Sequence, residues 1–247
     1  MRLPSFLKTF LHRIKRIFLI LLILQFFYIL LLKWVDPPIT AIQFMSWVGG
    51  DGLKRDYVNL EDISPHARLA VIASEDQLFP DHTGFDWNSI QKAYEYNKKK
   101  PGRVRGGSTI SQQVAKNVFL WQGRSWFRKG LESYFTFMIE MIWGKRRILE
   151  VYLNVAEMGK GIFGIEAAAQ AYFGKPANSL SAKEAAMIAA CLPNPKLYTV
   201  KPLSARVKNR SPWVETQMRN LRPDPDIQIL LSNDADAAIK KFNKDYD

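Results

Sequence analysis

The sequence of 247 residues is poor in cysteine and histidine: it contains one cysteine and three histidines. It has no internal repeat, heptad pattern or low-complexity block. A single cysteine excludes an intrachain disulfide. Because Cys191 lies in the apolar stretch AAMIAACLPNP, we expect a small core residue and not a reactive thiol. No second histidine stands at metal-ligand spacing from His82, so a metal site at His82 is not predicted.

Acidic residues are missing from residues 1–33, which contain six of the 35 lysines and arginines. The formal net charge of the chain is +12, and the 29 basic and 23 acidic residues of 34–247 leave +6 on that part. Half of the positive charge therefore belongs to the N-terminus. The remainder is only moderately basic, which argues against a nucleic-acid-binding protein.

One long apolar run follows the basic N-terminus. Residues 17–32 (IFLILLILQFFYILLL) contain only one polar residue, Gln25, and a helix over 17–35 would span roughly 28 Å, close to the hydrocarbon thickness of a bilayer. By the positive-inside rule, 1–16 is cytoplasmic and the chain after Trp34 lies outside the cytoplasm. A cleaved signal peptide is the alternative, but the run exceeds a typical signal core and no small-x-small cleavage site follows it.

The remaining chain divides into three parts. Residues 36–54 read as a linker, since Pro37 and Pro38 favour an extended exit from the membrane and a Gly-Gly-Asp-Gly turn follows. Residues 55–221 form the expected domain, and 222–247 a C-terminal extension that ends as a peripheral helix or a frayed tail. The basic, glycine-containing loop at 98–107 is either a solvated surface loop or a mobile cover over an anionic ligand.

Helix signals dominate the domain, whereas strand signals are weak and local. Expected helices start at the caps Ser64, Ser108, Ser125 and Ser181. Two more are expected over 147–158 and over 165–173, the second ending at Gly174. The sequence thus predicts a mainly α domain of seven or eight helices.

Several segments combine charge with turn or helix-start signals. In SEDQLFPDHTG (74–84) four ionisable residues follow a buried run, a pattern that fits either a solvated loop or a functional site. Residues 106–117 (GGSTISQQVAKN) place a glycine turn before a helix, where an anion can bind, although the P-loop spacing is absent. Arg128 and Glu132 are i, i+4 neighbours on one helix face. Opposite charges at this spacing fit an ordinary surface ion pair as well as a functional site.

Five segments in order resemble the peptidoglycan glycosyltransferases: EDQLFPDHTG (75–84), GGSTISQQVAKN (106–117), RKGLE (128–132), KRRILEVYLN (145–154) and GIEAAAQAYFGK (164–175). The resemblance covers residues 55–200 and is closest to the monofunctional, membrane-anchored biosynthetic transglycosylases of glycosyltransferase family 51. The S-x-x-K, S-x-N and K-T-G set of a penicillin-binding domain is absent; Ser5-Phe-Leu-Lys8 fits the first pattern only by chance.

The resemblance implies a lysozyme-like helical fold and an enzyme that polymerises lipid II into β-1,4-linked glycan strands, with inversion and release of undecaprenyl diphosphate. It implies an inner-membrane location with a periplasmic catalytic domain. The partners would be lipid II, the nascent strand and membrane lipid, with cell-wall synthesis or division proteins as further candidates. The resemblance implies no defined cofactor and leaves open a divalent cation (Mg or Mn) bound with the substrate diphosphate, as in some relatives.

The resemblance also implies roles for individual residues. Glu75 would be the general base, Glu132 the second essential glutamate, and Lys116 and Arg124 the cations on the donor diphosphate. Glu150 we interpret as structural. The remaining candidates are the further diphosphate-binding residues Arg128 and Lys129 and the supporting residues Asp76, Phe79, His82, Ser108, Thr109, Gln113 and Asn117.

Two other functions remain open at this stage. A lytic muramidase of the same fold would need a general acid, and the cations at Lys116 and Arg124 would serve no purpose in it. A non-catalytic envelope scaffold could use basic residues to dock on anionic lipid headgroups, but it would not require carboxylates within the basic cluster.

Overall fold

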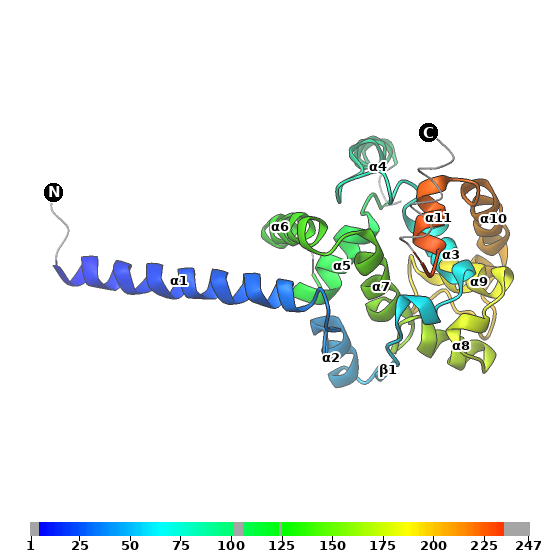
Figure 1. The fold of residues 1–247 in the computed structure, drawn as a ribbon, viewed down its shortest axis with the longest axis horizontal. Helices are drawn as coiled ribbons and strands as arrows, with labels where there is room; N and C mark the ends of the chain where they lie inside the picture. The colour runs from blue at the N-terminus through cyan, green and yellow to red at the C-terminus, as the bar shows by residue number, and fades with distance from the viewer. Residues whose placement is uncertain (1–4, 101–105, 124, 235–247) are drawn as a thin grey trace. The chain divides into compact units, whose positions relative to one another are not determined.

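The computed structural model describes residues 5–100, 106–123 and 125–234, and the chain divides into two compact units, Met1–Pro37 and Pro38–Asp247. The first unit contains one helix, α1 (Ser5–Leu31), drawn in blue in Figure 1. Its stretch Thr9–Leu31 has a mean hydropathy of 2.2, and it is long and apolar enough to cross a membrane. The helix is compatible with a single-pass anchor, as the sequence predicts, but a signal sequence would form the same kind of helix.

The second unit is mainly α-helical, which confirms the predicted fold class. Its sheet has three short strands in the order β1–β3–β2, with β1 parallel and β2 antiparallel to β3. The elements are α2 (Ala41–Val48), β1 (Lys54–Arg55), η1 (Leu60–Asp62), α3 (Pro65–Glu75), α4 (Trp87–Lys99), α5 (Ile110–Phe119), α6 (Trp126–Ile142), α7 (Lys145–Val155), β2 (Glu157–Gly159), β3 (Ile162–Phe163), α8 (Ile165–Phe173), η2 (Ala177–Ser179), α9 (Ala182–Cys191), α10 (Ala205–Leu221) and α11 (Pro225–Leu231).

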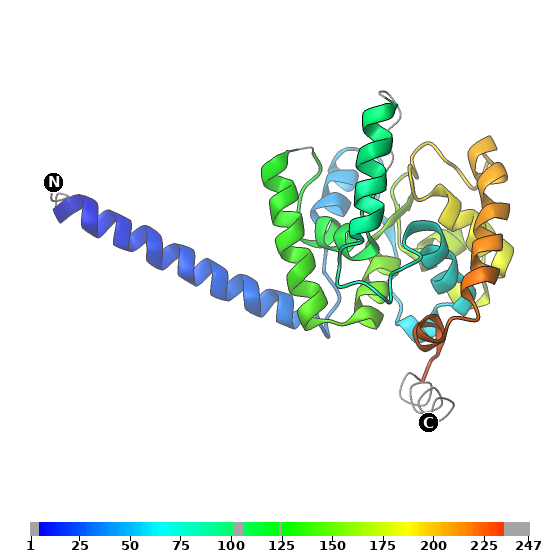
Figure 2. The same cartoon turned by 90° about the horizontal axis from the view of Figure 1, so that it is seen from above.

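The core of the second unit is built around α3 and α5. Helix α3 is buried from Ala67 to Ala73 and packs against α9, α10 and α11, whereas α5 packs against α6 and α7 (Figure 1). Helix α4 buries only Ala93 and extends away from its neighbours in Figure 2. Because Glu75 is the last residue of α3, the packing of this core decides where its carboxylate lies.

Most predicted helix starts are confirmed. Ser64 caps α3 ahead of Pro65, Ser125 caps α6, and Ser181 forms a capping box with Glu184 at the start of α9. Gly174 ends α8 in the left-handed conformation, with φ +67°. Cys191 is fully buried and burial raises the pKa of its thiol to about 12, which confirms the core role.

Two boundaries differ from the prediction. The cap of α5 is Thr109 and not Ser108, because Thr109 forms the reciprocal capping box with Gln112 while Ser108 is exposed. Helix α7 covers Lys145–Val155 and not 147–158: it starts directly after Gly144, whose φ of +77° ends the preceding turn, and Glu157–Gly159 is strand β2.

Within 55–221 the structure describes eight α-helices, α3 to α10, in agreement with the seven or eight expected for the domain, and two further helices, α2 and α11, lie outside these bounds. Helix α2 lies in the segment 36–54 that reads as a linker, and it buries Ile42, Gln43 and Ser46. Helix α10 continues through Pro212, a residue that usually signals a helix end. Tertiary packing therefore makes helices of segments whose local signals are weak or contrary.

Part of the C-terminal extension belongs to the folded unit. Arg68 of α3 is fully buried, and its guanidinium donates to the carbonyl oxygens of Ile63 (3.0 Å) and Leu231 (2.9 Å) and to Oδ1 of Asn233 (2.6 Å). Arg146 of α7 donates to the carbonyl oxygen of Ser232 at 2.6 Å. Two cations thus bind the carboxyl end of α11, where the helix dipole favours positive charge.

Candidate active site

Glu75 ends α3 and is only partly exposed. Its Oε2 accepts a hydrogen bond from Nε2 of Gln113 (3.0 Å), and its Oε1 accepts one from the Ser74 hydroxyl (3.2 Å). Burial raises the pKa of Glu75 above its ordinary value, and the Gln113 hydrogen bond and the positive charge of Arg210 partly offset this. Within the described chain Glu75 has no ion-pair partner, so its carboxylate remains available as a base.

Asp76 has a different environment from its neighbour Glu75. Its carboxylate accepts hydrogen bonds from Nε2 of His82 (3.0 Å) and from the backbone N–H of Ile110 (2.9 Å), and it is buried. Phe79 is fully buried and packs edge-on against the His82 ring. These three predicted supporting residues therefore hold the loop after α3 in contact with the start of α5.

The start of α5 brings the second predicted segment to Glu75. Thr109 caps the helix, and its hydroxyl donates to the Gly84 carbonyl at 2.7 Å. Gln113, one turn later, also accepts a hydrogen bond from the Tyr152 hydroxyl (3.3 Å), so its amide is held on both sides. Asn117 is buried one turn further along α5.

Lys116 lies one turn beyond Gln112 on α5 and within electrostatic range of both glutamates. Burial lowers the pKa of its ammonium, and the negative charges of Glu132 and Glu75 oppose that shift, whereas the cations Arg128 and Lys129 add to it. No residue that the structure describes forms an ion pair with Lys116. A bound anion would therefore stabilise its charged form.

Glu132 anchors the cations at the start of α6. Its buried carboxylate accepts hydrogen bonds from Nη1 of Arg128 (3.0 Å) and from the ammonium of Lys129. Nε of Arg128 is buried without a hydrogen-bond partner among the described residues. Two cations around one carboxylate leave a net positive charge here, which suits an anionic ligand.

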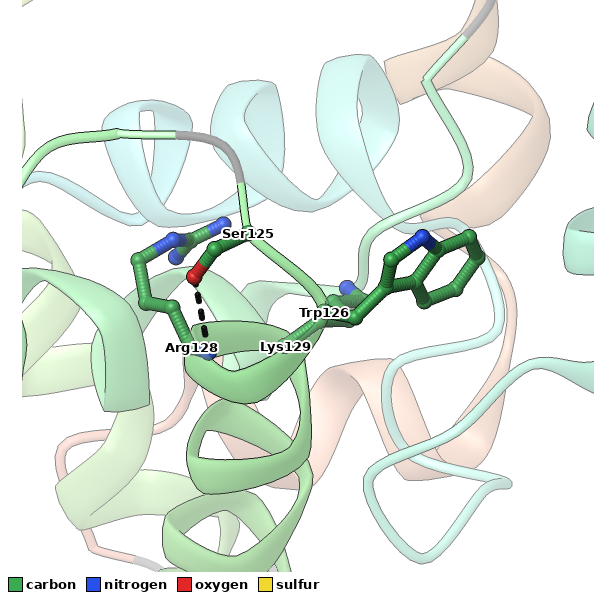
Figure 3. A pocket seen from close by; sticks show the side chains of 4 residues that line it. All are labelled: Ser125, Trp126, Arg128 and Lys129. Carbon is green, nitrogen blue, oxygen red and sulfur yellow. Dashed lines mark hydrogen bonds between the residues drawn. The ribbon is translucent and has the colours of Figure 1, made fainter.

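A pocket of about 290 Å³ opens at this end of α6, lined by Ser125, Trp126, Arg128 and Lys129. In Figure 3 the side chains of Arg128 and Trp126 extend from the helix start in different directions, and the dashed line marks the Ser125 cap on the Arg128 N–H. Trp126 is 93% exposed. The pocket thus combines positive charge with a large apolar surface.

Arg124, the other predicted diphosphate cation, lies outside the described residues. The charged side chains described around Lys116 are two cations, Arg128 and Lys129, and two carboxylates, Glu132 and Glu75, and Glu132 is occupied by both cations. The one carboxylate left, Glu75, supplies too few oxygen ligands for a divalent cation, so most of its ligands would have to come from the diphosphate.

Sequence reasoning missed one group of residues beside Glu75. Arg210 of α10 donates to the carbonyl oxygen of Ser74 (3.2 Å), and it lines a cavity of about 280 Å³ with Arg206, Asn209 and Trp213. Burial lowers the pKa of Arg210, and the charge of Glu75 opposes that shift. Helix α10 lies beyond the five segments that carried the resemblance, so only its basic residues could have suggested this cavity.

Glu150 is separate from these groups. Its Oε2 accepts a hydrogen bond from the backbone N–H of Leu60 (3.2 Å), and its Oε1 accepts one from Arg147. It joins α7 to η1, in agreement with the structural role expected for it.

Comparison with known proteins identifies the family. Residues 42–219 match the family model described as Transglycosylase. The biosynthetic peptidoglycan transglycosylase of Salmonella enteritidis is 52% identical over 200 residues, covering 78% of this chain and 83% of the relative. The protein with the same description from Mannheimia succiniciproducens is 58% identical over 166 residues, covering 67% and 68%. The chain therefore belongs to the transglycosylase family, whose lysozyme-like helical domain polymerises the glycan strands of peptidoglycan.

Proposed function

We propose that this glycosyltransferase uses lipid II as its substrate, forms β-1,4 linkages with inversion and releases undecaprenyl diphosphate. The observation that carries the proposal is the contrast between the two glutamates. Among the described residues, Glu75 accepts hydrogen bonds only from the neutral side chains of Gln113 and Ser74, whereas Glu132 is neutralised by Arg128 and Lys129. Carboxylates in such different environments perform different tasks.

Glu75 is proposed as the general base. The attacking 4-hydroxyl must lose its proton as the glycosidic bond forms, and one ionised carboxylate within hydrogen-bond reach is sufficient for that step. Burial raises the pKa of Glu75 toward the working pH, which strengthens it as a base while the Gln113 hydrogen bond helps to keep it ionised. Displacement of an α-linked diphosphate by this hydroxyl yields the β-linkage.

The cations near Lys116 are proposed to bind the donor diphosphate. A diphosphate is a good leaving group that needs no protonation, and the negative charge that grows on it as the bond breaks is best stabilised by fixed cations. Lys116 has no ion-pair partner among the described residues, and Arg128 has a free Nε. Arg124 is proposed to join them, as the sequence motif implies.

Glu132 is proposed to position cations and not to transfer a proton. Its two oxygens are each engaged, one by Arg128 and one by Lys129. Removing it would leave both side chains without an anchor, so activity would fall even though Glu132 never touches the reacting atoms.

The acceptor also carries a diphosphate, because it is a lipid-linked sugar. We propose that Arg206 and Arg210 bind it, since the cavity that they line lies next to Ser74 and Glu75. The acceptor hydroxyl would then reach Glu75 from the α10 side and the donor from the α5 side.

The proposed location is the inner membrane, with 1–16 in the cytoplasm and the catalytic domain in the periplasm. The support is the apolar helix and the basic residues that precede it. The anchor would keep the domain where its lipid substrate is concentrated. Association with cell-wall synthesis or division proteins is proposed on function alone.

The test has three arms, each with the full-length chain purified in detergent. The chain is given labelled lipid II to measure polymerisation, finished glycan strands to measure cleavage, and vesicles of anionic lipid to measure binding. We expect the chain to convert lipid II into a ladder of strands on a gel. Cleavage of finished glycan without polymerisation would favour the muramidase, and vesicle binding without either reaction would favour the scaffold.

A further inference from the structure

Lys145, the first residue of α7, contacts three groups at once. Its ammonium donates hydrogen bonds to the His82 carbonyl oxygen and to Oε1 of Glu140 (2.7 Å), and it lies 4.7 Å from the centroid of the Phe79 ring. Its side chain is only 21% exposed. Such an ammonium connects the loop after α3 to α6 and α7.

The other side of the His82 loop is fixed by its imidazole. Nδ1 accepts a hydrogen bond from the Gly84 N–H (3.1 Å), so the ring proton is on Nε2 and is donated to Asp76. Oδ2 of Asp76 also accepts a hydrogen bond from the backbone N–H of Ile110, the first residue of α5. The loop is thus joined to α5 through one buried carboxylate.

A third set of contacts returns from α5 to Lys145. The hydroxyl of Ser111, next to Ile110, donates to Oε1 of Glu140, the oxygen that also accepts from Lys145. The loop approaches α6 closely here: Gly84 has φ +94°, and a Cβ on it would lie 2.8 Å from Cγ2 of Thr136. A larger residue would push the loop off α6.

These contacts form a closed ring that runs from Lys145 through the His82 loop, Asp76, the Ile110–Ser111 peptide and Glu140 back to Lys145. Among the described residues, no hydrogen bond or ion pair joins a member of this ring to Lys116, Arg128 or Lys129. However, the ring adjoins Glu75 through Asp76, and it holds the first turn of α5, whose next turn carries Gln113.

We propose that Lys145 and Glu140 are positioning residues for the transfer reaction: through the ring they fix Glu75 relative to Gln113 and to the donor cations. This inference rests on the proposed role of Glu75 as the base. If the ring opens, the loop and the start of α5 can shift independently. A displacement of about 1 Å at a reacting group can cost roughly 100-fold in rate.

The prediction concerns the division of the effect between kcat and KM. The full-length Lys145→Met variant should lose about 10- to 100-fold in kcat, with KM for lipid II within about threefold of the parent chain, because the diphosphate cations are untouched. Glu140→Gln, which removes the charge that Lys145 binds, should lower kcat in the same way. Since both changes open one ring, the double variant should be no slower than the slower single variant.

A matched control is available at the start of α9. Lys175 and Glu184 form an ion pair of 2.6 Å that does not touch the ring, so Lys175→Met should keep the parent kcat. If Lys145→Met does not fold, Ser111→Ala replaces it. That change removes a single hydroxyl from the ring, and it should lower kcat about three- to tenfold while the melting temperature falls by only a few degrees.

The series includes Glu75→Gln, which separates the two hypotheses. If Glu75→Gln polymerises normally, the proposed base is wrong. If Glu75→Gln is inactive, the ring is rejected when folded Lys145→Met keeps the parent kcat, when its defect lies in KM alone, or when the losses of Lys145→Met and Glu140→Gln multiply in the double variant.

Discussion

The hydrogen bond from Gln113 to Glu75 should control the acid side of the pH dependence. Burial raises the pKa of Glu75 and this bond partly offsets the rise, because it stabilises the ionised carboxylate. The base acts only when it is ionised. Gln113→Met keeps the length of the side chain but removes the donor, so the acid limb of kcat/KM should move to higher pH.

The size of the effect follows from the contact. A hydrogen bond to a charged group contributes about 1.5 to 3 kcal/mol, which corresponds to roughly a 10- to 100-fold change in the ionised fraction on the acid limb. Glu75 is partly exposed, so water can replace some of this stabilisation. We therefore expect kcat/KM on the acid limb to fall about tenfold. The loss should shrink as the pH rises, because Glu75 then becomes ionised in both proteins. At still higher pH both proteins should lose activity, because burial lowers the pKa of Lys116 and its ammonium gives up its charge.

The assay is kcat/KM for lipid II polymerisation against pH, because this parameter reports the ionisation of the free enzyme. Two controls match the change. Gln170→Met removes the same kind of contact, a 2.9 Å bond to Glu166 within α8, and Tyr152→Phe removes the other partner of Gln113. An acid limb of folded Gln113→Met that coincides with that of the parent chain, or lies at lower pH, would refute the reasoning.

Three further predictions concern the cations, the core and the anchor. Lys116→Ala and Arg124→Ala should each lower kcat by about 100-fold or more, and Lys98→Ala, on exposed α4, should do far less; turnover assays of folded variants check this. Arg68→Met should lower the Tm by about 5 to 15 °C, because buried carbonyls lose their donors; a melt that matches the parent would show that α11 docks without it. Deleting 1–33 should leave a folded domain that polymerises in detergent less efficiently, and a periplasm-only reporter at the C-terminus of the full chain should be active.

Local signals in the sequence predicted the helices that begin with strong caps. Ser64-Pro65 and the Ser181–Glu184 box are read directly from residue chemistry, and both helices start there. At α5 two hydroxyl residues, Ser108 and Thr109, compete for the cap, and only the glutamine three residues after Thr109 decides between them. Helices such as α10, with Pro212 inside, depend on packing that no local pattern reports.

The candidate site was predictable as a set of residues but not as an arrangement. The motifs singled out Glu75, Gln113 and Glu132, yet the direct hydrogen bond between the first two joins residues 38 positions apart. Contacts from Arg210 and Lys145 likewise depend on which helices meet the carboxyl end of α3. Such contacts come from tertiary packing, so sequence spacing alone does not predict them.

The central claim is that Glu75, and not Asp76, is the general base. Its direct test is the polymerisation rate of Glu75→Gln beside that of Asp76→Asn, with lipid II binding and a thermal melt for each. Glu75→Gln removes the basicity and keeps the size of the side chain, so we expect a folded protein that binds lipid II and loses about 10² to 10⁴-fold in rate. Asp76→Asn keeps the base and can still accept the Ile110 N–H bond, so it should lose less. A folded Glu75→Gln that polymerises at nearly the parent rate would contradict the claim.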